Sequence, residues 1–306
     1  MKGMELAKAY YAQYGRPMLE QQFADVQDRI AVGLAGHGSE CFGYDDDLSR
    51  DHDFEPGFCL WLTEADEREF GFRLFRAYGR LPKEFDGVKM ENKSLFGSDF
   101  KGVHTIGQFY AFYVGSHLPQ TNEDWLRIPD HYLAEATNGE VFSDPLGEFT
   151  RIREHLKCGL PEDVRLKKLG SCVFSMAQLG QYNYARCLKH GEAAAAAVAL
   201  ADFCKSAAQA VFLLNRAHAP YYKWLFRAMS ELPVLGDRAE VLGQLLRAPG
   251  DAAQNLPRIE QLAADVAAAL RDQGLARCTG DYLEPYAYEI GEHIRDSALR
   301  NSPVML

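Results

Sequence analysis

The sequence lacks a regular cysteine framework. Its seven cysteines are scattered along the chain, and no two of them form a Cys-x-x-Cys pair. A disulfide scaffold or a structural zinc site would need a paired spacing. We therefore expect unpaired thiols, several of them buried, in a reducing compartment.

Long apolar runs and a secretory leader are also missing. No uninterrupted apolar stretch reaches the roughly eighteen residues that a membrane span needs. The N-terminal segment MKGMELAKAYYAQYG lacks the apolar centre of a signal peptide. The sequence thus predicts a cytoplasmic protein with no membrane partner.

An excess of basic residues is missing as well. The chain carries 33 Lys and Arg against 43 Asp and Glu, a net charge of −10. Proteins that bind nucleic acid generally present a basic face, so the charge argues against a nucleic-acid partner. It does not exclude a nucleotide, because a metal ion and a few local Lys or Arg residues suffice to hold a triphosphate. The sequence leaves the oligomeric state open.

The first half of the chain alternates helix and strand patterns. With 306 residues the chain is long enough for two domains. Such alternation predicts helices that pack on a mixed sheet. The expected helices are 4–13, 16–29, 63–78 and 110–114, and the expected strands are 30–36, 53–62, a pair within 82–106 around the turn 97–99, and 140–142.

Strand signals disappear after about residue 154, and helical periodicity takes over. No Pro/Gly/Ser-rich linker separates the two parts, so we expect them to pack tightly. The fold class predicted is α+β, with a mixed-sheet domain over 1–156 and an all-α helical bundle domain over 157–306. The expected helices of the second part are 162–189, 191–216, 219–230, 237–247, 256–273 and 284–299.

Two carboxylates stand one residue apart in Asp51-His52-Asp53, twelve positions after Ser39. In a strand, Asp51 and Asp53 would point to one face, and such a pair needs a cation. Mg²⁺ suits them, because it takes a few carboxylates together with phosphate oxygens. Gly38 and Ser39 end the preceding strand pattern, where backbone N–H groups and a small hydroxyl can approach a phosphate.

A simpler interpretation is that these acids belong to a solvated loop. The segment DDDLSRDHD holds five Asp in nine residues, and acidic loops are common. Asp45, Asp46 and Asp47 lie outside the alternation of Asp51 and Asp53. We predict that these three are loop acids or a second cation site.

The order of apolar strand, Gly-Ser and Asp-x-Asp resembles the signature of the nucleotidyltransferase superfamily. The string GSECFGYDDDLSRDHDFEP (38–56) is similar to an uncharacterised bacterial family of that superfamily, DUF4037. The similarity continues through EVFSDPLGEFTRIREHL (140–156) to LNRAHAPYYKW (214–224). The resemblance implies a nucleotidyltransferase-like fold and a metal-dependent transfer of a nucleotide, but no particular acceptor.

Active members of this superfamily carry a third carboxylate on a neighbouring strand, as metal ligand or as base. The matching segment of this chain, 101–106, offers His104 instead of an acid. His104 could be the general base, since the unperturbed pKa of histidine lies near neutrality, or it could be structural. Other acids that could fill the role are Glu91, Asp99, Glu135 and Asp144, and the last could instead cap a helix.

One cationic and aromatic segment stands out in the helical half. In Tyr221-Tyr222-Lys223-Trp224, Lys223 could neutralise a β- or γ-phosphate while a tyrosine ring stacks on the base. Similar Lys-Trp segments occur in antibiotic-modifying nucleotidyltransferases. Packing of the aromatic rings between helices is the alternative, and Arg216 is a further cationic candidate.

The leading functional hypothesis is transfer of a nucleoside monophosphate, AMP from ATP, to a hydroxyl of a small molecule. Asp51, Asp53 and His104 would be catalytic, with Mg²⁺ on the two aspartates. Gly38, Ser39 and Lys223 would bind the nucleotide. Transfer of AMP to a protein side chain is one alternative, and an inactive nucleotide-binding or scaffold protein is the other.

Overall fold

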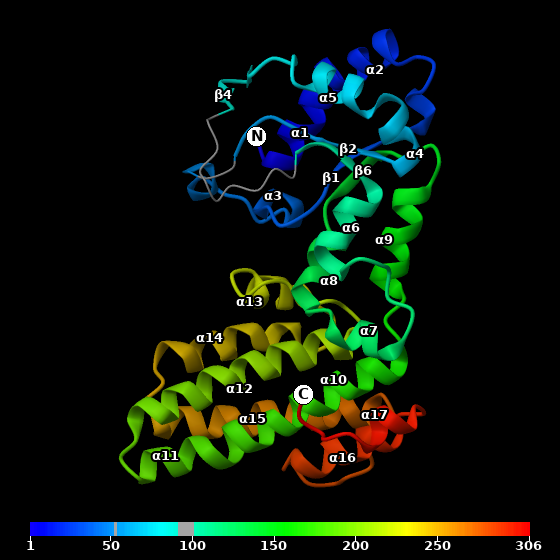
Figure 1. Cartoon of the computed structure of the whole chain (residues 1–306). Helices are drawn as coiled ribbons and strands as arrows, with labels where there is room; N and C mark the ends of the chain where they lie inside the picture. Colours follow the sequence, from blue (N-terminus) through cyan, green and yellow to red (C-terminus); the bar gives the residue numbers. More distant parts are fainter. Residues whose placement is uncertain (52–53, 91–100) are drawn as a thin grey trace. The chain divides into compact units, whose positions relative to one another are not determined.

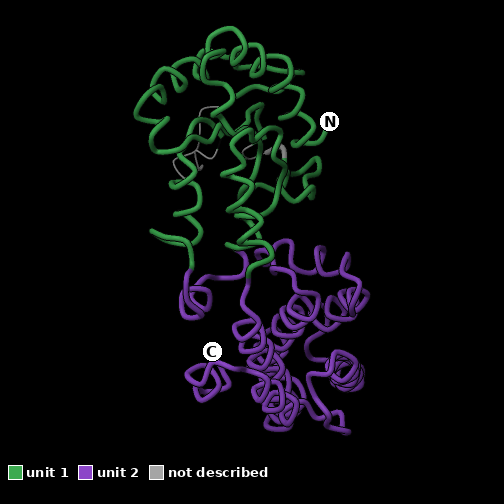
Figure 2. Tube along the Cα trace, turned by 90° about the vertical axis from the view of Figure 1, so that its right-hand side faces the viewer, with its two compact units in different colours: residues 1–119, 132–159 green, residues 120–131, 160–306 purple. Residues whose placement is uncertain are grey.

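The computed structural model describes residues 1–51, 54–90 and 101–306, and it divides the chain into two compact units (Figure 2). The first unit comprises Met1–Pro119 and Tyr132–Gly159, and the second comprises Gln120–His131 and Leu160–Leu306. The sequence predicted one boundary, after residue 156. The division observed lies after Gly159, and a short earlier segment joins the second unit.

The first unit is built on a four-stranded sheet with the strand order β5-β2-β1-β6 (Figure 1). Strand β1 pairs antiparallel with β2 and β6, whereas β2 pairs parallel with β5, so the sheet is mixed, as predicted. Every residue of β1 and β2 is buried, which explains their continuous apolar sequences. The strands are β1 (Ala31–Leu34), β2 (Cys59–Leu62), β5 (Gly102–Thr105) and β6 (Glu140–Ser143).

The N-terminal helical segment is continuous, although the sequence predicted a break near residue 15. It consists of α1 (Gly3–Tyr10), a π-helical turn (Tyr11–Gly15) and α2 (Arg16–Gln22). Gly15 does not end a helix. A Cβ atom on Gly15 would lie 2.4 Å from the ring of Phe58, so close packing requires the glycine there.

The two faces of β2 pack against different partners. Leu60 and Leu62 join the buried cluster that contains Tyr10 of α1. On the opposite face, the ring of Trp61 stacks on Phe149 with the ring centroids 3.8 Å apart. Strand β2 is therefore covered on both faces and contributes to the core along its whole length.

Shorter elements complete the first unit. Thr63 caps the helix predicted over 63–78, because its Oγ1 accepts a hydrogen bond from the Asp66 N–H (3.1 Å). The turn predicted at 97–99 lies outside the described residues. The remaining elements are α3 (Ser39–Phe42), a 3-10 turn (Leu48–Asp51), α4 (Glu64–Asp66), a π turn (Glu67–Gly71), α5 (Phe72–Tyr78), β3 (Glu84–Phe85), β4 (Val88–Lys89), α6 (Ile106–Val114) and α9 (Glu148–Cys158).

The second unit is helical, as predicted for the C-terminal half (Figure 1). The helix expected over 219–230 is shorter than predicted, because residues 221–224 form turns before α13 begins. The α-helices are α7 (Asn122–Arg127), α10 (Glu162–Met176), α11 (Ala185–Lys189), α12 (Ala193–Leu214), α13 (Leu225–Met229), α14 (Ala239–Arg247), α15 (Ala252–Asp272), α16 (Glu284–Glu292) and α17 (Ser297–Asn301), and α8 (Asp130–Thr137) begins in this unit and ends in the first.

Helix α12 forms the centre of the second unit. Phe203, Cys204 and Ala208 on this helix are fully buried among α10, α14 and α15. By length and composition α12 is also the one helix of the described chain that could cross a membrane, yet 61% of its most apolar window is buried inside the protein. The burial identifies α12 as a core helix.

All seven cysteines lie in the described part of the chain and remain thiols, as predicted. Cys41, Cys59 and Cys204 are buried, whereas Cys158, the last residue of α9, is exposed. Burial raises the pKa of the Cys59 and Cys204 thiols to about 12. These two side chains therefore pack as small apolar groups.

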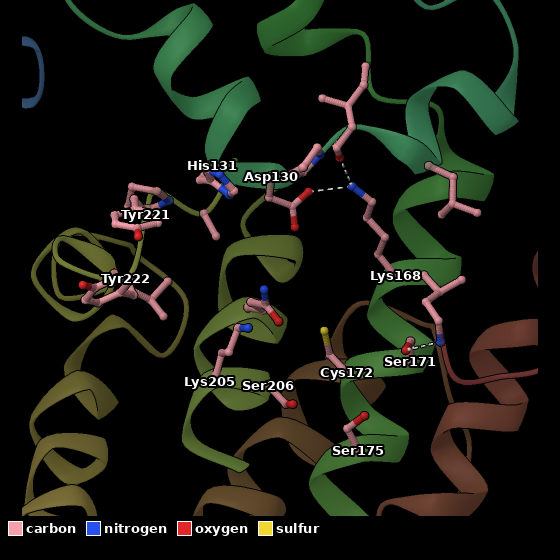
Figure 3. A pocket seen from close by; sticks show the side chains of 18 of the residues that line it. Asp130, His131, Lys168, Ser171, Cys172, Ser175, Lys205, Ser206, Tyr221 and Tyr222 are labelled. Atoms are coloured by element: carbon pink, nitrogen blue, oxygen red, sulfur yellow. Dashed lines mark hydrogen bonds and ion pairs between the residues drawn. The ribbon is translucent and has the colours of Figure 1, made fainter. Parts of the chain in front are cut away.

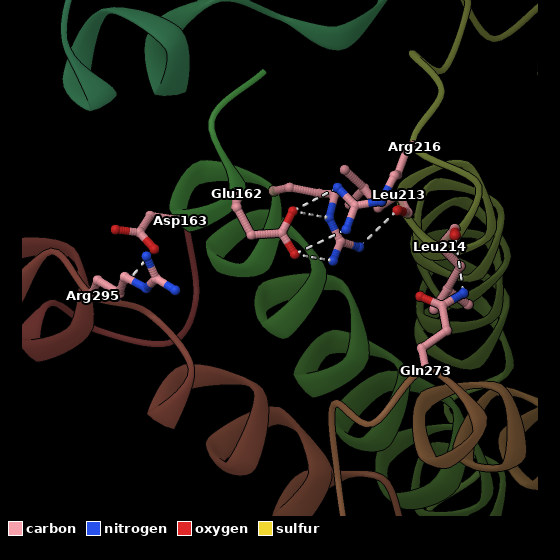
Figure 4. Close-up of polar contacts among 8 residues, drawn as sticks. Glu162, Asp163, Leu213, Leu214, Arg216, Gln273 and Arg295 are labelled. Atoms are coloured by element: carbon pink, nitrogen blue, oxygen red, sulfur yellow. Dashed lines mark hydrogen bonds and ion pairs between the residues drawn. The ribbon is translucent and has the colours of Figure 1, made fainter. Parts of the chain in front are cut away.

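The C-terminal end of α12 is closed by side chains from other helices (Figure 4). Arg165 of α10 donates to the Leu213 carbonyl (3.0 Å), and Gln273 donates to the Leu214 carbonyl (3.0 Å). These carbonyls have no partner within their own helix. Arg165 is 2% exposed, so its charge requires a counter-ion.

Glu162 supplies that counter-ion. Its carboxylate accepts two hydrogen bonds from Arg165 (2.6 and 2.9 Å) and two from Arg216 (2.7 and 3.2 Å). The bonds from Arg165 contribute most to lowering the pKa of Glu162 to about 2. Glu162 thus joins the start of α10 to the turn that follows α12.

We expect Glu162→Gln to destabilise the second unit by about 1 kcal/mol at pH 7, a value reduced for solvent screening because the side chain is 44% exposed. The folded-state pKa is lowered, so this stabilisation is present above the ordinary pKa of 4.5 and is lost as the pH falls toward 2. Urea unfolding at pH 7 and pH 3.5 should show the difference from wild type shrinking at the lower pH. Glu192→Gln, at an exposed position, is the matched control.

Candidate functional site

The loop that leaves β1 carries the predicted phosphate-binding residues. Gly36 adopts a φ of +129°, a conformation that favours glycine. Gly38 is the N-cap of α3, and Ser39 is the first residue of that helix. Both are half-buried, so the turn is close to the surface at the end of a buried strand.

Asn138 holds this loop from a distant part of the chain. Its side-chain carbonyl accepts from the Gly36 N–H (2.9 Å), and its amide donates to the Gly36 carbonyl (2.6 Å). The Gly139 N–H also donates to the Cys41 carbonyl (2.9 Å). Arg153 donates to the carbonyls of both Asn138 and Gly139 (3.2 and 3.1 Å). The loop around Gly38 is therefore fixed before any ligand binds.

Lys101 lies against the same helix α3. Its ammonium is 3.3 Å from a carboxylate oxygen of Glu40 and donates to the Glu55 carbonyl (3.0 Å). The two side chains of this ion pair are only 15% and 12% exposed. Glu40 is next to the Gly38-Ser39 turn, so Lys101 offsets a negative charge where a phosphate is predicted. Sequence reasoning missed this pair, since only the fold brings the two residues together.

The predicted strand placement of the two aspartates is wrong for Asp51. Asp51 ends a 3-10 turn, and β2 begins only at Cys59. Pro56 and Gly57, which disfavour regular pairing, precede the strand. Asp53 lies outside the described residues. The alternation of side chains in a strand therefore does not explain how Asp51 and Asp53 would converge.

The neighbouring loop acids have separate roles. Asp46 accepts hydrogen bonds from the backbone of Leu48 and Ser49 (3.0 and 3.1 Å), as expected of a loop acid. Asp45 is 7% exposed, and its Oδ2 accepts from the Gly3 N–H (2.7 Å) at the start of α1. The Oδ1 atom of Asp45 is buried and has no partner in the described structure.

His104 lies on β5, directly opposite Trp61 of β2 in the parallel register. It is half-buried. This is the strand position predicted for it, next to β2. The role of His104 as a base stays a prediction.

Of the two alternatives that the structure describes, Glu135 of α8 and Asp144, Glu135 is the buried one. It is 7% exposed, and burial raises the pKa of its carboxyl to about 7. Burial is the main cause that raises the pKa of the Tyr113 hydroxyl. Electrostatic repulsion from Glu135, Cys41 and Cys59 raises this pKa further.

The other candidates fall into three groups. Asp144 accepts hydrogen bonds from the N–H groups of Gly147 and Thr150 (3.1 and 2.8 Å), so it caps the start of α9. Glu91 and Asp99 lie outside the described residues. Arg216 is engaged with Glu162, and Lys223 is exposed in a turn of the second unit.

The described residues alone form no group of three His, Cys, Asp or Glu side chains that could hold a metal ion. The predicted metal ligands Asp51 and Asp53 therefore stay a prediction. The free Oδ1 of Asp45, six residues before Asp51, is the kind of hard oxygen donor that Mg²⁺ takes. The donor set fits Mg²⁺ better than zinc, which favours His and Cys.

The variant Gly139→Ala tests whether the close packing of the Asn138-Gly139 turn against the loop after β1 stabilises the protein. A Cβ on Gly139 (φ +67°) would lie 2.0 Å from the Leu34 carbonyl oxygen, whereas Gly147 (φ +70°) has open space around it. The left-handed conformation alone costs about 1–2 kcal/mol in each variant. We expect Gly139→Ala to lose about 1–3 kcal/mol more than Gly147→Ala in urea unfolding, because of the overlap. Equal losses would contradict the contact.

Comparison with known proteins gives a family match and a likeness to solved structures. Residues 125–225 match the model of DUF4037, a domain of unknown function. No curated protein matches the chain. A nucleotidyltransferase-like protein from Exiguobacterium sibiricum 255-15, solved at 1.90 Å, is similar over 93% of this chain and 80% of its own, with 10% identity and a TM-score of 0.35.

An identity of 10% and a TM-score of 0.35 carry no argument about this chain. The family match includes residues 132–159 of the first unit and residues 125–131 and 160–225 of the second. The predicted resemblance to DUF4037 is confirmed over residues 125–225.

Proposed function

We propose that the protein is a metal-dependent nucleotidyltransferase that transfers AMP from ATP to a hydroxyl of a small molecule. The observation that supports this most directly is the fixed loop at Gly36–Ser39. A loop that approaches phosphate needs small residues and a rigid backbone, and Asn138 supplies the rigidity. The prediction of Asp51 and Asp53 as acidic ligands completes the proposal.

In this proposal, Gly38 and Ser39 contact the phosphates. The Lys101 ammonium offsets the charge of Glu40, so that an anion is not repelled from the turn. Lys223 stays a proposed phosphate contact on the second unit. These groups would act on the negatively charged phosphates of the bound nucleotide.

Asp51 and Asp53 would hold Mg²⁺, with Asp45 Oδ1 as a further oxygen nearby in sequence. The bound ion would stabilise the negative charge that builds up on the triphosphate as pyrophosphate leaves. The protein's own contribution is to keep these carboxylates ionised and in place.

The transfer requires a group that accepts a proton. The acceptor hydroxyl oxygen forms a bond to the α-phosphorus, the bond from that phosphorus to the β-phosphate oxygen breaks, and pyrophosphate takes the electron pair. The hydroxyl proton passes to a base, for which we propose His104 or Glu135. A raised pKa suits Glu135 to this task, because a base works best with a pKa near the working pH.

We expect Asp53→Ala to abolish label transfer when the protein is incubated with α-labelled ATP, Mg²⁺ and a cell extract. The loss should be on the order of a hundredfold or more, the usual effect of removing a group that stabilises developing charge. The thermal stabilisation by ATP and Mg²⁺ should disappear as well. Asp28→Ala, at an exposed position outside the acidic loop, is the control and should keep both.

Three outcomes of that incubation distinguish the hypotheses. A labelled small molecule supports the proposal. A labelled protein supports AMP transfer to a protein side chain. The absence of any label, together with normal stabilisation by ATP, indicates a nucleotide-binding protein that does not catalyse transfer.

The pH dependence of transfer should identify the base. We expect one of His104→Gln and Glu135→Gln to lower turnover by about 10²- to 10⁴-fold and to remove the rise in rate with pH near neutrality. The rise is expected because the base must be unprotonated to accept a proton. If both variants keep the wild-type profile between pH 5.5 and 8.5, neither residue is the base.

A further inference from the structure

The second unit contains a cavity of about 560 Å³ (Figure 3). Its walls come from the segment Leu126–His131, from α10 and α12, from residues 219–222 and Leu225, and from Leu306. All of these belong to the second unit, and all except Leu306 lie within the segment that matches DUF4037. The volume is in the usual range for small-molecule sites, roughly 300–1,000 Å³.

We propose that this cavity binds a small anion that carries an aromatic ring, a phosphate monoester or a carboxylate. The inference does not depend on nucleotide transfer by the first unit. It rests on the charge of the walls, on polar groups that have no partner, and on an aromatic wall.

The charged side chains around the cavity are mainly cationic. Arg127, Lys168 and Lys205 line it, against the single carboxylate side chain of Asp130. Asp130 is already paired, with the Lys168 ammonium 2.6 Å from its Oδ1. A cationic ligand would therefore meet repulsion without a free carboxylate to bind, in a protein whose net charge is −10.

Lys205 is the cation available to a ligand. Arg127 is paired with Glu123, and Lys168 with Asp130, whereas the Lys205 ammonium has no hydrogen-bond or ion-pair partner in the described structure. In Figure 3 its side chain extends along the cavity beside α12. An unpaired ammonium can bind an anion without breaking an existing ion pair.

Neutral donors surround Lys205. Ser175 of α10 and Ser206 and Gln209 of α12 line the cavity, and among the described residues none of their side chains has a hydrogen-bond partner. Hydroxyl and amide groups donate to the oxygens of a phosphate or carboxylate. An apolar ligand would cover these groups without satisfying them, at a cost of about 1–3 kcal/mol for each buried group.

The opposite wall is aromatic. The rings of Tyr221 and Tyr222 have centroids 4.4 Å apart, and the His131 ring is 5.5 Å from that of Tyr221. Tyr222 is 65% exposed, so its ring leaves apolar area uncovered. Burial lowers the pKa of His131, so its imidazole is neutral at pH 7 and adds a flat surface. A ring on the ligand can pack against these side chains.

Calorimetric titration of the full chain tests the proposal. The probes are phenyl phosphate, benzoate, inorganic phosphate and benzyl alcohol, in EDTA so that metal-dependent binding is suppressed. We expect phenyl phosphate or benzoate to bind, and the tighter one identifies the anionic group. Inorganic phosphate, which lacks the ring, and benzyl alcohol, which lacks the charge, should each bind at least about tenfold more weakly.

Lys205→Gln should lower the affinity for the preferred probe by about 10- to 100-fold, which is the effect of losing a charged hydrogen bond. Ser206→Ala should weaken it several-fold and is the second variant if Lys205→Gln fails to fold. Lys189→Gln, at an exposed position on α11, is the control and should bind like wild type. Asp53→Ala should also bind like wild type, which separates this site from the proposed catalytic one.

Some results would overturn the proposal. These are no binding of any probe by the wild-type chain, equal affinity for benzyl alcohol and for the tighter of the two aromatic anions, and wild-type affinity in folded Lys205→Gln. Tyr222→Ala should weaken the binding of that aromatic anion but not the binding of inorganic phosphate. Equal weakening of both, or of neither, contradicts the role of the aromatic wall.

Discussion

The fold of the second unit depends on hydrogen bonds to the carbonyl groups at the C-terminal end of the buried helix α12. The last carbonyls of α12 lie beyond the N–H groups of their own helix, and Arg165 and Gln273 donate to them, beside the Arg216 N–H, which also donates to the Leu213 carbonyl. Arg165 is buried, and Glu162 pairs with it. Since α10 and α12 form two walls of the cavity, the contact of Arg165 joins the two helices that carry Ser175 and Lys205.

The first unit solves a similar problem with neutral groups. The loop after β1 has backbone atoms that no strand partner satisfies, and the side chain of Asn138 pairs with both polar atoms of Gly36. An amide can do this because it donates and accepts at once. The carbonyls of Asn138 and Gly139 in turn accept from Arg153, and Lys101 is a second cation near the loop.

The predictable parts of this fold are those that local sequence determines. The apolar run at 30–36 and the helical periodicity beyond 162 are repeated features, and both were predicted correctly. The first two helices were predicted as separate segments, whereas they are continuous through Gly15, whose contact with Phe58, far along the chain, the local sequence does not show. Asn138 was missed for the same reason, since its partner Gly36 is 102 residues away. The strand alternation expected at Asp51 failed because β2 starts later, after Pro56 and Gly57.

The exposed thiol of Cys158 has a practical consequence. It ends α9, one residue before the point where the chain passes from the first unit to the second. The most buried thiols, Cys59 and Cys204, have pKa values raised to about 12 and react poorly with alkylating reagents. A maleimide dye or nitroxide would therefore attach first beside this junction. The natural sequence thus provides a spectroscopic reporter of the orientation of the two units, without an engineered cysteine.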